Sequence, residues 1–152
     1  MSVEAGTSPL NPIDSKSPWV SRQIAEYLAT DGAKPTFRYG APLLLLTTRG
    51  RKSGTWHRTC LIYGEDDGRF LLVASLGGAP KHPVWYLNLE ANPDVYLQVG
   101  ARKFRAIART ATAEEKPPLW DRMVGVYPDY AAYQLKTERL IPVVILDPIE
   151  DR

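Results

Sequence analysis

Short apolar segments of five to eight residues recur along this chain, separated by turn signals such as Asp66-Asp67-Gly68 and Gly100. Segments of this length with alternating or continuous apolar residues favour β-strands, and the aspartate-glycine turn is typical of a hairpin. The segments expected to form strands are Leu43–Thr48, Trp56–Tyr63, Phe70–Ala74, Val95–Val99, Phe104–Ala108 and Ile141–Leu146.

Six strands with only short helices predict a mainly β, α+β fold, organised as a closed or split six-stranded β-barrel, because closure removes exposed sheet edges. The tightly packed interior of such a barrel leaves little room for a ligand. We therefore expect a ligand to bind outside, in a groove beside the barrel.

The helices are expected to be short and few. Ser17-Pro18 is typical of a helix start, and Thr112 with Glu115 forms a capping-box pattern. Residues 1–16 are expected to be a flexible arm without a motif, and residues 17–152 a single domain. The helices should run from Pro18 to Gly32, from Pro83 to Asn92, from Thr112 to about Gly125, and over a short stretch from Asp129.

Several function classes have little support in the sequence. The single cysteine, Cys60, cannot form an internal disulfide, and His57 and His82 have no metal-ligand spacing. No Gly-x-Ser-x-Gly motif is present, and the apolar run Pro42–Leu46 is too short to span a bilayer. We expect a soluble, cytoplasmic protein with no metal site and no hydrolytic nucleophile.

Positive charge is concentrated in the middle of the chain. Between Gly32 and Ala113 there are twelve Lys and Arg residues against five Asp and Glu, although the net charge of the chain is only +2. Such a distribution would attract an anionic ligand. Solvated strand faces are an equally good explanation at this point.

Gly50-Arg51-Lys52-Ser53-Gly54 joins two expected strands. Its glycines allow backbone amides to turn toward a ligand, and two cations and a hydroxyl supply charge-assisted hydrogen bonds, so phosphate is a natural ligand. The spacing is too short for a Walker motif. Taken alone, the segment is more often a solvated hairpin turn.

Two further segments carry candidate chemistry. Ser75–Pro83 follows a strand and opens a helix, which predicts a second anion site, with a mobile loop as the alternative. Tyr127, Tyr130 and Tyr133 recur at helical spacing and could contact a planar substrate and hydrogen-bond to its oxygen. Without other observations, a core-packing face explains this spacing better.

Taken in order, these strings resemble the deazaflavin-dependent nitroreductase family, whose members use coenzyme F420 and are known mainly from actinobacteria. The resemblance runs from about Pro42 to Pro148. It rests on Leu44-Leu45-Leu46-Thr47-Thr48 with Gly50-Arg51-Lys52-Ser53-Gly54, Ala74-Ser75 with Gly77-Gly78, Trp85-Tyr86-Leu87-Asn88-Leu89, Ala91-Asn92-Pro93, and Tyr127-Pro128 with Tyr130 and Tyr133.

The resemblance implies a split barrel of the flavin-mononucleotide-binding type and a role for each matching position. Arg51, Lys52 and Ser53 would bind the phosphate and polyglutamate tail of F420. Ser75 and Tyr133, with Tyr127 and Tyr130, are the implied catalytic residues of the substrate pocket. The other implied cofactor contacts are Gly54, Thr59, Ala74, Ser75, Gly77, Gly78, Lys81, Val84, Trp85 and Asn88.

The chain departs from the family pattern in three places. Leu76 stands where relatives have a lysine, Cys60 where a proline is common, and His57-Arg58 where the basic pair is arranged differently. The lost lysine weakens the expected grip on the cofactor tail or shifts it to Lys81.

The implied activity is hydride transfer from reduced F420 to a planar small molecule, either a quinone, an enone or a nitroaromatic. The alternatives are an oxidoreductase that uses FMN, a deazaflavin-binding protein without activity, and, ranked last, a nucleic-acid-binding barrel. We expect no nucleic-acid partner, and a peripheral membrane contact only if the substrate is a lipid quinone.

Overall fold

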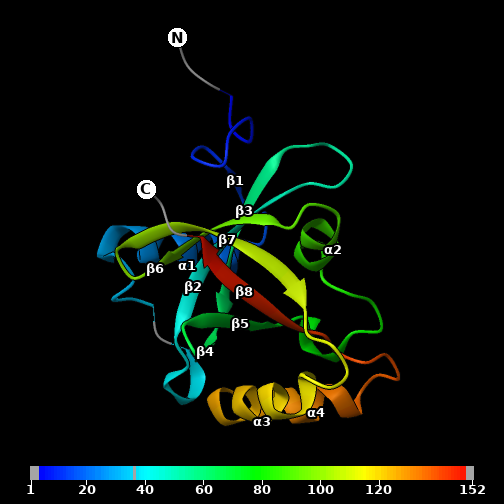
Figure 1. Cartoon of the computed structure of the whole chain (residues 1–152). Helices are drawn as coiled ribbons and strands as arrows, with labels where there is room; N and C mark the ends of the chain where they lie inside the picture. Colours follow the sequence, from blue (N-terminus) through cyan, green and yellow to red (C-terminus); the bar gives the residue numbers. More distant parts are fainter. Residues whose placement is uncertain (1–3, 36, 150–152) are drawn as a thin grey trace.

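The computed structural model describes residues 4–35 and 37–149, with the side chain of Arg38 excepted. Within these residues, eight strands form one sheet, and four α-helices and two 3-10 turns pack around it (Figure 1). The elements are β1 (Ile13–Asp14), α1 (Pro18–Thr30), η1 (Arg38–Gly40), β2 (Leu43–Arg49), β3 (Trp56–Ile62), β4 (Gly64–Asp66), β5 (Arg69–Val73), η2 (Leu76–Gly78), α2 (Val84–Ala91), β6 (Asp94–Val99), β7 (Arg102–Thr110), α3 (Lys116–Val126), α4 (Asp129–Leu135) and β8 (Val143–Ile149).

The strand order is β1-β3-β2-β6-β7-β8-β5-β4, and all neighbours are antiparallel except β1 and β3. The expected mixed α+β class is therefore confirmed. Each of the six expected strands is present, and β1 and β4 are additional. β1 was missed because its two residues, Ile13 and Asp14, belong to the segment expected to be a flexible arm. The mobility of that arm stays a prediction.

Three strands, β2, β5 and β8, are buried on both faces. On β5, Leu72 packs in a core cluster with strands β2, β6, β7 and β8, whereas its neighbour Leu71 packs against α3 and α4. On β2, Leu44 and Leu46 join the first of these clusters, and Leu45 joins a third cluster beneath α1. Two-sided burial explains why these strands read as continuous apolar runs, since alternation appears only where one face meets water.

The last strand begins two residues later than the sequence predicts. Pro142 has no N–H, and the Ile141 N–H donates to the Gln134 side chain at 2.9 Å instead of joining the strand ladder. The strand then continues through Pro148, which pairs with Ala106 of β7. The capping box forms as expected through reciprocal Thr112 and Glu115 hydrogen bonds, but the regular helix starts only at Lys116.

Helix α1 is fixed to the sheet by Tyr27, which is 1% exposed. Its hydroxyl accepts a hydrogen bond from the Gly100 N–H at 2.7 Å and donates to the Gln98 carbonyl at 3.3 Å. These bonds tie α1 to the turn between β6 and β7. No helix in the described part of the chain is long and apolar enough to cross a membrane.

Replacing Tyr27 with phenylalanine should lower the free energy of unfolding by about 1–2 kcal/mol, because the Gly100 N–H loses its acceptor. Urea denaturation measures the change. Tyr63→Phe is the matched control, since Tyr63 is a partly buried phenol whose hydroxyl makes no hydrogen bond within the described residues. Equal losses in the two variants would contradict the anchoring role.

Candidate functional site

A cavity of about 730 Å³ lies along β3, between the N-terminal segment and α2. Most residues of β3 are only half-buried. The cavity has the size of common small-molecule sites. Its lining residues are Ile13, Asp14, Ser15, Lys16, Trp19, Val20, Thr48, Gly50, Arg51, Lys52, Ser53, His57, Arg58, Thr59, Cys60, Leu61, Leu76, Pro83, Val84, Trp85 and Asn88.

A second cavity of about 240 Å³ adjoins the first. The two share the wall residues Trp19, Cys60, Leu61, Leu76, Pro83 and Trp85. The other residues that line the smaller cavity are Gln23, Phe37, Leu43, Ile62, Val73, Ser75, Gly77, Tyr127, Tyr130 and Tyr133. The larger space is therefore basic at its loop end, and the smaller one is aromatic.

The Gly50–Gly54 loop is anchored to α2. The Arg51 N–H donates to Asn88 Oδ1 at 3.1 Å, and Asn88 is only 4% exposed. Within the loop, the Gly54 N–H donates to the Gly50 carbonyl, and the Ser53 hydroxyl oxygen accepts from the Thr55 N–H. The backbone is thus held in place while the Arg51 and Lys52 side chains reach solvent at the cavity wall.

Four cations border the larger cavity, and one of them is neutralised. Arg58 forms a bidentate ion pair with Asp14 of β1, with a shortest distance of 2.6 Å. Lys16, Arg51 and Lys52 make no ion pair within the described residues. Their uncompensated charge favours an anionic ligand at this end.

The Ser75 loop is held in an unusual backbone conformation. Leu76, Gly77 and Gly78 have consecutive positive φ angles of 47°, 63° and 84°. Gly78 packs against α4, and a Cβ atom at this position would lie 2.7 Å from the Tyr133 carbonyl oxygen. The Ser75 loop therefore packs directly against α4, the helix that carries Tyr130 and Tyr133. This contact brings Ser75 and Tyr133 to the same cavity.

The three tyrosines pack together and also face the smaller cavity. The Tyr127 and Tyr133 hydroxyls are 3.4 Å apart, and the Tyr127 and Tyr130 rings meet edge to face at 5.0 Å. Burial raises the pKa of Tyr127, with a further increase from the Tyr133 hydrogen bond, and burial also raises the pKa of Tyr130. The core-packing interpretation of the stripe is confirmed, since Tyr127 and Tyr130 belong to a core cluster and Tyr133 packs against it. All three also line the smaller cavity, and their contact with a substrate stays a prediction.

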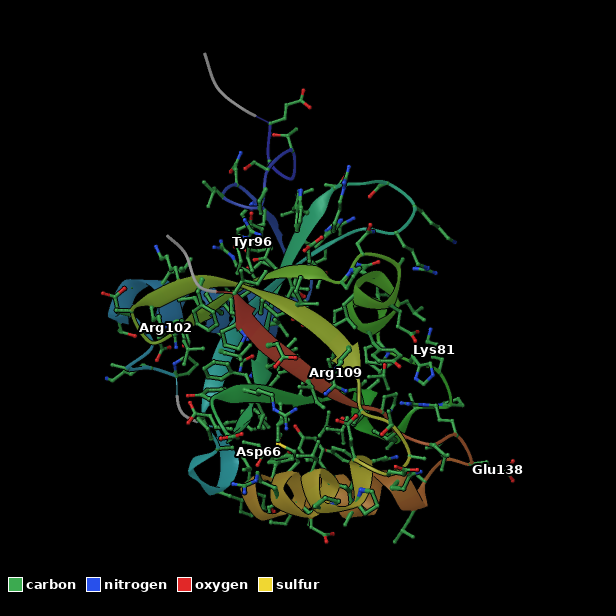
Figure 2. All side chains as sticks on the ribbon, viewed as in Figure 1. Asp66, Lys81, Tyr96, Arg102, Arg109 and Glu138 are labelled. Carbon is green, nitrogen blue, oxygen red and sulfur yellow. The ribbon has the colours of Figure 1, made fainter. Side chains whose placement is uncertain are left out.

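Most site residues predicted from the sequence line one of the two cavities. Gly54, Ala74, Gly78 and Lys81 are described in the structure but lie outside both linings. Ala74 and Gly78 are buried on the loop that carries Ser75, whereas Lys81 is exposed further along it (Figure 2). Those that line the larger cavity are Arg51, Lys52, Ser53, Thr59, Val84, Trp85 and Asn88, and those that line the smaller one are Ser75, Gly77, Trp85, Tyr127, Tyr130 and Tyr133.

Sequence reasoning missed the contribution of the first helix. Trp19 and Gln23 lie one turn apart on α1 and line the smaller cavity. Trp19 is 52% exposed, and its ring lies 5.7 Å from the ring of Phe37. The Phe37 ring in turn lies 5.6 Å from the ring of Tyr127. A tryptophan outside the buried stripe of an amphipathic helix was the signal that could have revealed this wall.

The departure at Cys60 introduces no reactive thiolate. Cys60 lies where the two cavities meet, and burial raises the pKa of its thiol to about 12. The thiol therefore stays protonated at neutral pH, and only a thiolate is a strong nucleophile. Within the described residues, no group of three His, Cys, Asp or Glu side chains could hold a metal ion.

Known proteins similar to this chain identify its family. The model of the F420H(2)-dependent quinone reductase family matches residues 19–148. A putative F420H(2)-dependent quinone reductase of Mycobacterium tuberculosis is 42% identical over 112 residues, which cover 74% of this chain and 94% of the relative. The chain belongs to the F420H(2)-dependent quinone reductase family. The resemblance inferred from the sequence is thereby confirmed.

Two solved structures are similar to this family member. A structure of an F420-H2 dependent reductase is 43% identical, with a TM-score of 0.65, and covers 76% of this chain and 100% of its own. Another, described as a domain-swapped dimer, is 40% identical, with a TM-score of 0.68, and covers 88% of this chain and 100% of its own. The range matched by the family model includes α3, α4 and the Gly50–Gly54 loop but excludes Lys16 and β1.

The contact between the Ser75 loop and α4 can be tested with two glycine variants. Gly78→Ala should lower the free energy of unfolding by about 2 kcal/mol or more, because strain at positive φ adds to a clash with backbone. Gly77→Ala has positive φ but no atom within 4 Å of the added Cβ, so only about 1 kcal/mol is expected there. Chemical denaturation compares them, and a larger loss at Gly77 would rule out this packing.

Proposed function

We propose that this chain is a reductase that binds reduced coenzyme F420 and transfers a hydride to a quinone. The observation that carries the proposal is the continuity of a basic cavity with an aromatic one through six shared wall residues. An elongated cofactor with an anionic tail and a planar ring matches this arrangement. The names of the related proteins support the same cofactor and acceptor.

The tail of the cofactor is assigned to the loop end of the larger cavity. Arg51, Lys52 and Ser53 supply two cations and a hydroxyl on a backbone that the Asn88 side chain already holds in place. Preorganisation of this kind reduces the entropy lost on binding. Leu76 offers no charge where relatives have a lysine, and Lys16, on the same cavity wall, has no ion-pair partner among the residues that the structure describes. We assign to Lys16 the compensating role that the sequence suggested for Lys81.

The ring end is assigned to the wall shared by the two cavities. Trp85 of α2 and Leu76 line both spaces, so a planar ring between them would face the acceptor in the smaller cavity. When bound, the reduced deazaflavin supplies a hydride, because carbon replaces the reactive flavin nitrogen of its ring. The chain itself orients the two partners and excludes water from between them.

Ser75 and the tyrosines are assigned to the acceptor. Ser75, Tyr127, Tyr130 and Tyr133 are among the residues that line the smaller cavity. Hydroxyl groups at this end can hydrogen-bond to charge that develops on a substrate oxygen. Tyr133 is the most accessible of the three phenols. The Tyr127 hydroxyl lies 3.4 Å from the Tyr133 hydroxyl and can hydrogen-bond to it. An enone or a nitroaromatic presents an oxygen of the same kind and is an alternative acceptor.

We also infer that the sheet is a six-stranded split barrel. β1 contains only two residues, and β3 and β4 are separated by Tyr63 alone although they lie near opposite ends of the strand order. If β3 and β4 are one bent strand, the two ends of the sheet meet at this bend. The remaining strands then number six with β3–β4 counted once. Peripheral membrane contact and a cytoplasmic location stay predictions.

Reversing both charges of the loop, with Arg51→Glu and Lys52→Glu together, should weaken F420 binding by at least about tenfold, because attraction to the acidic tail becomes repulsion. Titration of F420 fluorescence measures the affinity. Arg22→Glu with Lys34→Glu is the control, since it changes net charge equally at exposed residues outside both cavities. Unchanged affinity in the loop variant would remove the proposed tail site, and tight binding of FMN but not F420 would favour the FMN alternative.

Tyr133→Phe should slow turnover with a quinone by about a hundredfold, which corresponds to roughly 3 kcal/mol of transition-state stabilisation, and leave F420 affinity nearly unchanged. Stopped-flow oxidation of the reduced cofactor gives the rate. Tyr96→Phe, a phenol outside both cavities, should retain full activity. A Tyr133 variant as fast as the unmodified protein would exclude the phenol from the reaction.

A further inference from the structure

Arg139 lies on the segment between α4 and β8, outside both cavities, and carries no role in the proposed reaction so far. Its guanidinium group nevertheless bonds to the loop that carries Ser75. The Nη2 atom donates to the Ser75 carbonyl at 2.7 Å, and Nη1 donates to the Ala74 carbonyl at 3.2 Å. The Nε atom donates to the Ala79 carbonyl at 2.8 Å, so both ends of the strained turn are held by one side chain.

A fourth contact extends the same interaction along the loop. Nη1 lies 3.0 Å from His82 Nδ1. Because a guanidinium has only donors, Nδ1 is the acceptor and the imidazole proton is on Nε2. Figure 2 shows the two loops at the same side of the molecule, marked by Lys81 and Glu138, the neighbours of His82 and Arg139 in the chain.

The bonds of Arg139 go to neutral groups. Within the described residues it forms no ion pair, and desolvation lowers the pKa of its guanidinium from the usual value. A partly desolvated arginine without a carboxylate is uncommon unless its donors are used elsewhere. Here the planar fork satisfies three backbone carbonyls at once, which a lysine ammonium on a flexible stem cannot do with the same geometry.

The segment that carries Arg139 is itself held by α4, the helix that carries Tyr130 and Tyr133. Gln134, the residue after Tyr133, donates from Nε2 to the Arg139 carbonyl at 2.8 Å, and its Oε1 accepts from the Ile141 N–H. The segment that carries Arg139 is therefore fixed relative to α4. The guanidinium then fixes the Ser75 loop relative to that segment.

We propose that Arg139 is a positioning residue that holds Ser75 opposite Tyr133 by clamping the carbonyls on both sides of the Leu76-Gly77-Gly78 turn. The proposal rests on the proposed function of Ser75 and Tyr133. Leu76 occupies a backbone region that non-glycine residues avoid, with φ at 47°, so the turn persists only where its surroundings impose it. Without the clamp, the loop relaxes and Ser75 leaves the cavity wall that it shares with the three tyrosines.

The clamp can be tested first without cofactor or substrate. The Gly78 N–H donates to the Ser75 carbonyl and the Ala79 N–H donates to the Leu76 carbonyl, so both amides report on the turn. In Arg139→Ala and Arg139→Lys, hydrogen–deuterium exchange at these amides should be at least tenfold faster, with exchange on β8 unchanged. Arg122→Ala, which removes an exposed arginine that lies 3.5 Å from Asp66, is the matched control and should leave the loop amides as they are. Equal protection in the Arg139 variants and the unmodified protein would overturn the proposal.

Turnover separates positioning from general destabilisation. In Arg139→Ala, kcat for quinone reduction should fall at least tenfold, F420 affinity should stay within about twofold because the Arg51 loop is untouched, and added methylguanidinium should restore part of the rate. In Arg139→Lys the charge is retained and the rate should stay low. Full activity in Arg139→Lys, or a loss in Arg139→Ala that methylguanidinium does not reverse, would contradict the clamp. If the unmodified protein reduces no quinone, the proposed function fails, whereas the exchange result still decides whether Arg139 orders the loop.

Discussion

Two-sided burial of β2, β5 and β8 is the constraint on which the site depends. These strands carry apolar side chains on both faces, so they require cover from the core shared by the strands on one side and from helices on the other. The four helices supply this cover and flank other parts of the sheet. β3 is left half-covered, and the larger cavity runs along it.

The site is assembled from segments that are far apart in the chain. The basic loop follows β2, the Ser75 loop follows β5, and the tyrosines come from the C-terminal helices (Figure 1). Three of the contacts between remote segments are made by single polar side chains. Asn88 joins the basic loop to α2, Tyr27 joins α1 to the β6–β7 turn, and Arg139 joins the Ser75 loop to the segment after α4. Buried polar contacts of this kind specify one arrangement where apolar packing alone would tolerate several.

The sequence was sufficient for the six longer strands and for the two loops between elements, because short apolar runs and glycine-rich turns are local signals; it missed the short strands β1 and β4. It was insufficient where tertiary contacts replace local ones. Ile141 was placed in the last strand, yet its N–H bonds to Gln134, which no local pattern reveals. The roles of Trp19 and Arg139 were missed for the same reason, since the exposure of the first and the acceptors of the second depend on residues remote in the chain.

Helix α1 contributes Trp19 and Gln23 to a cavity that the helix also helps to close. Thermodynamic linkage follows from that double role, because a ligand that needs these side chains binds only molecules in which α1 is docked. At a hundred times its dissociation constant, such a ligand adds about 2.7 kcal/mol to the stability of the docked state. Release of the ligand and undocking of the N-terminal helix are therefore coupled events. A change that favours undocking of α1 also weakens binding of the ligand, and the coupling free energy is the same in both directions.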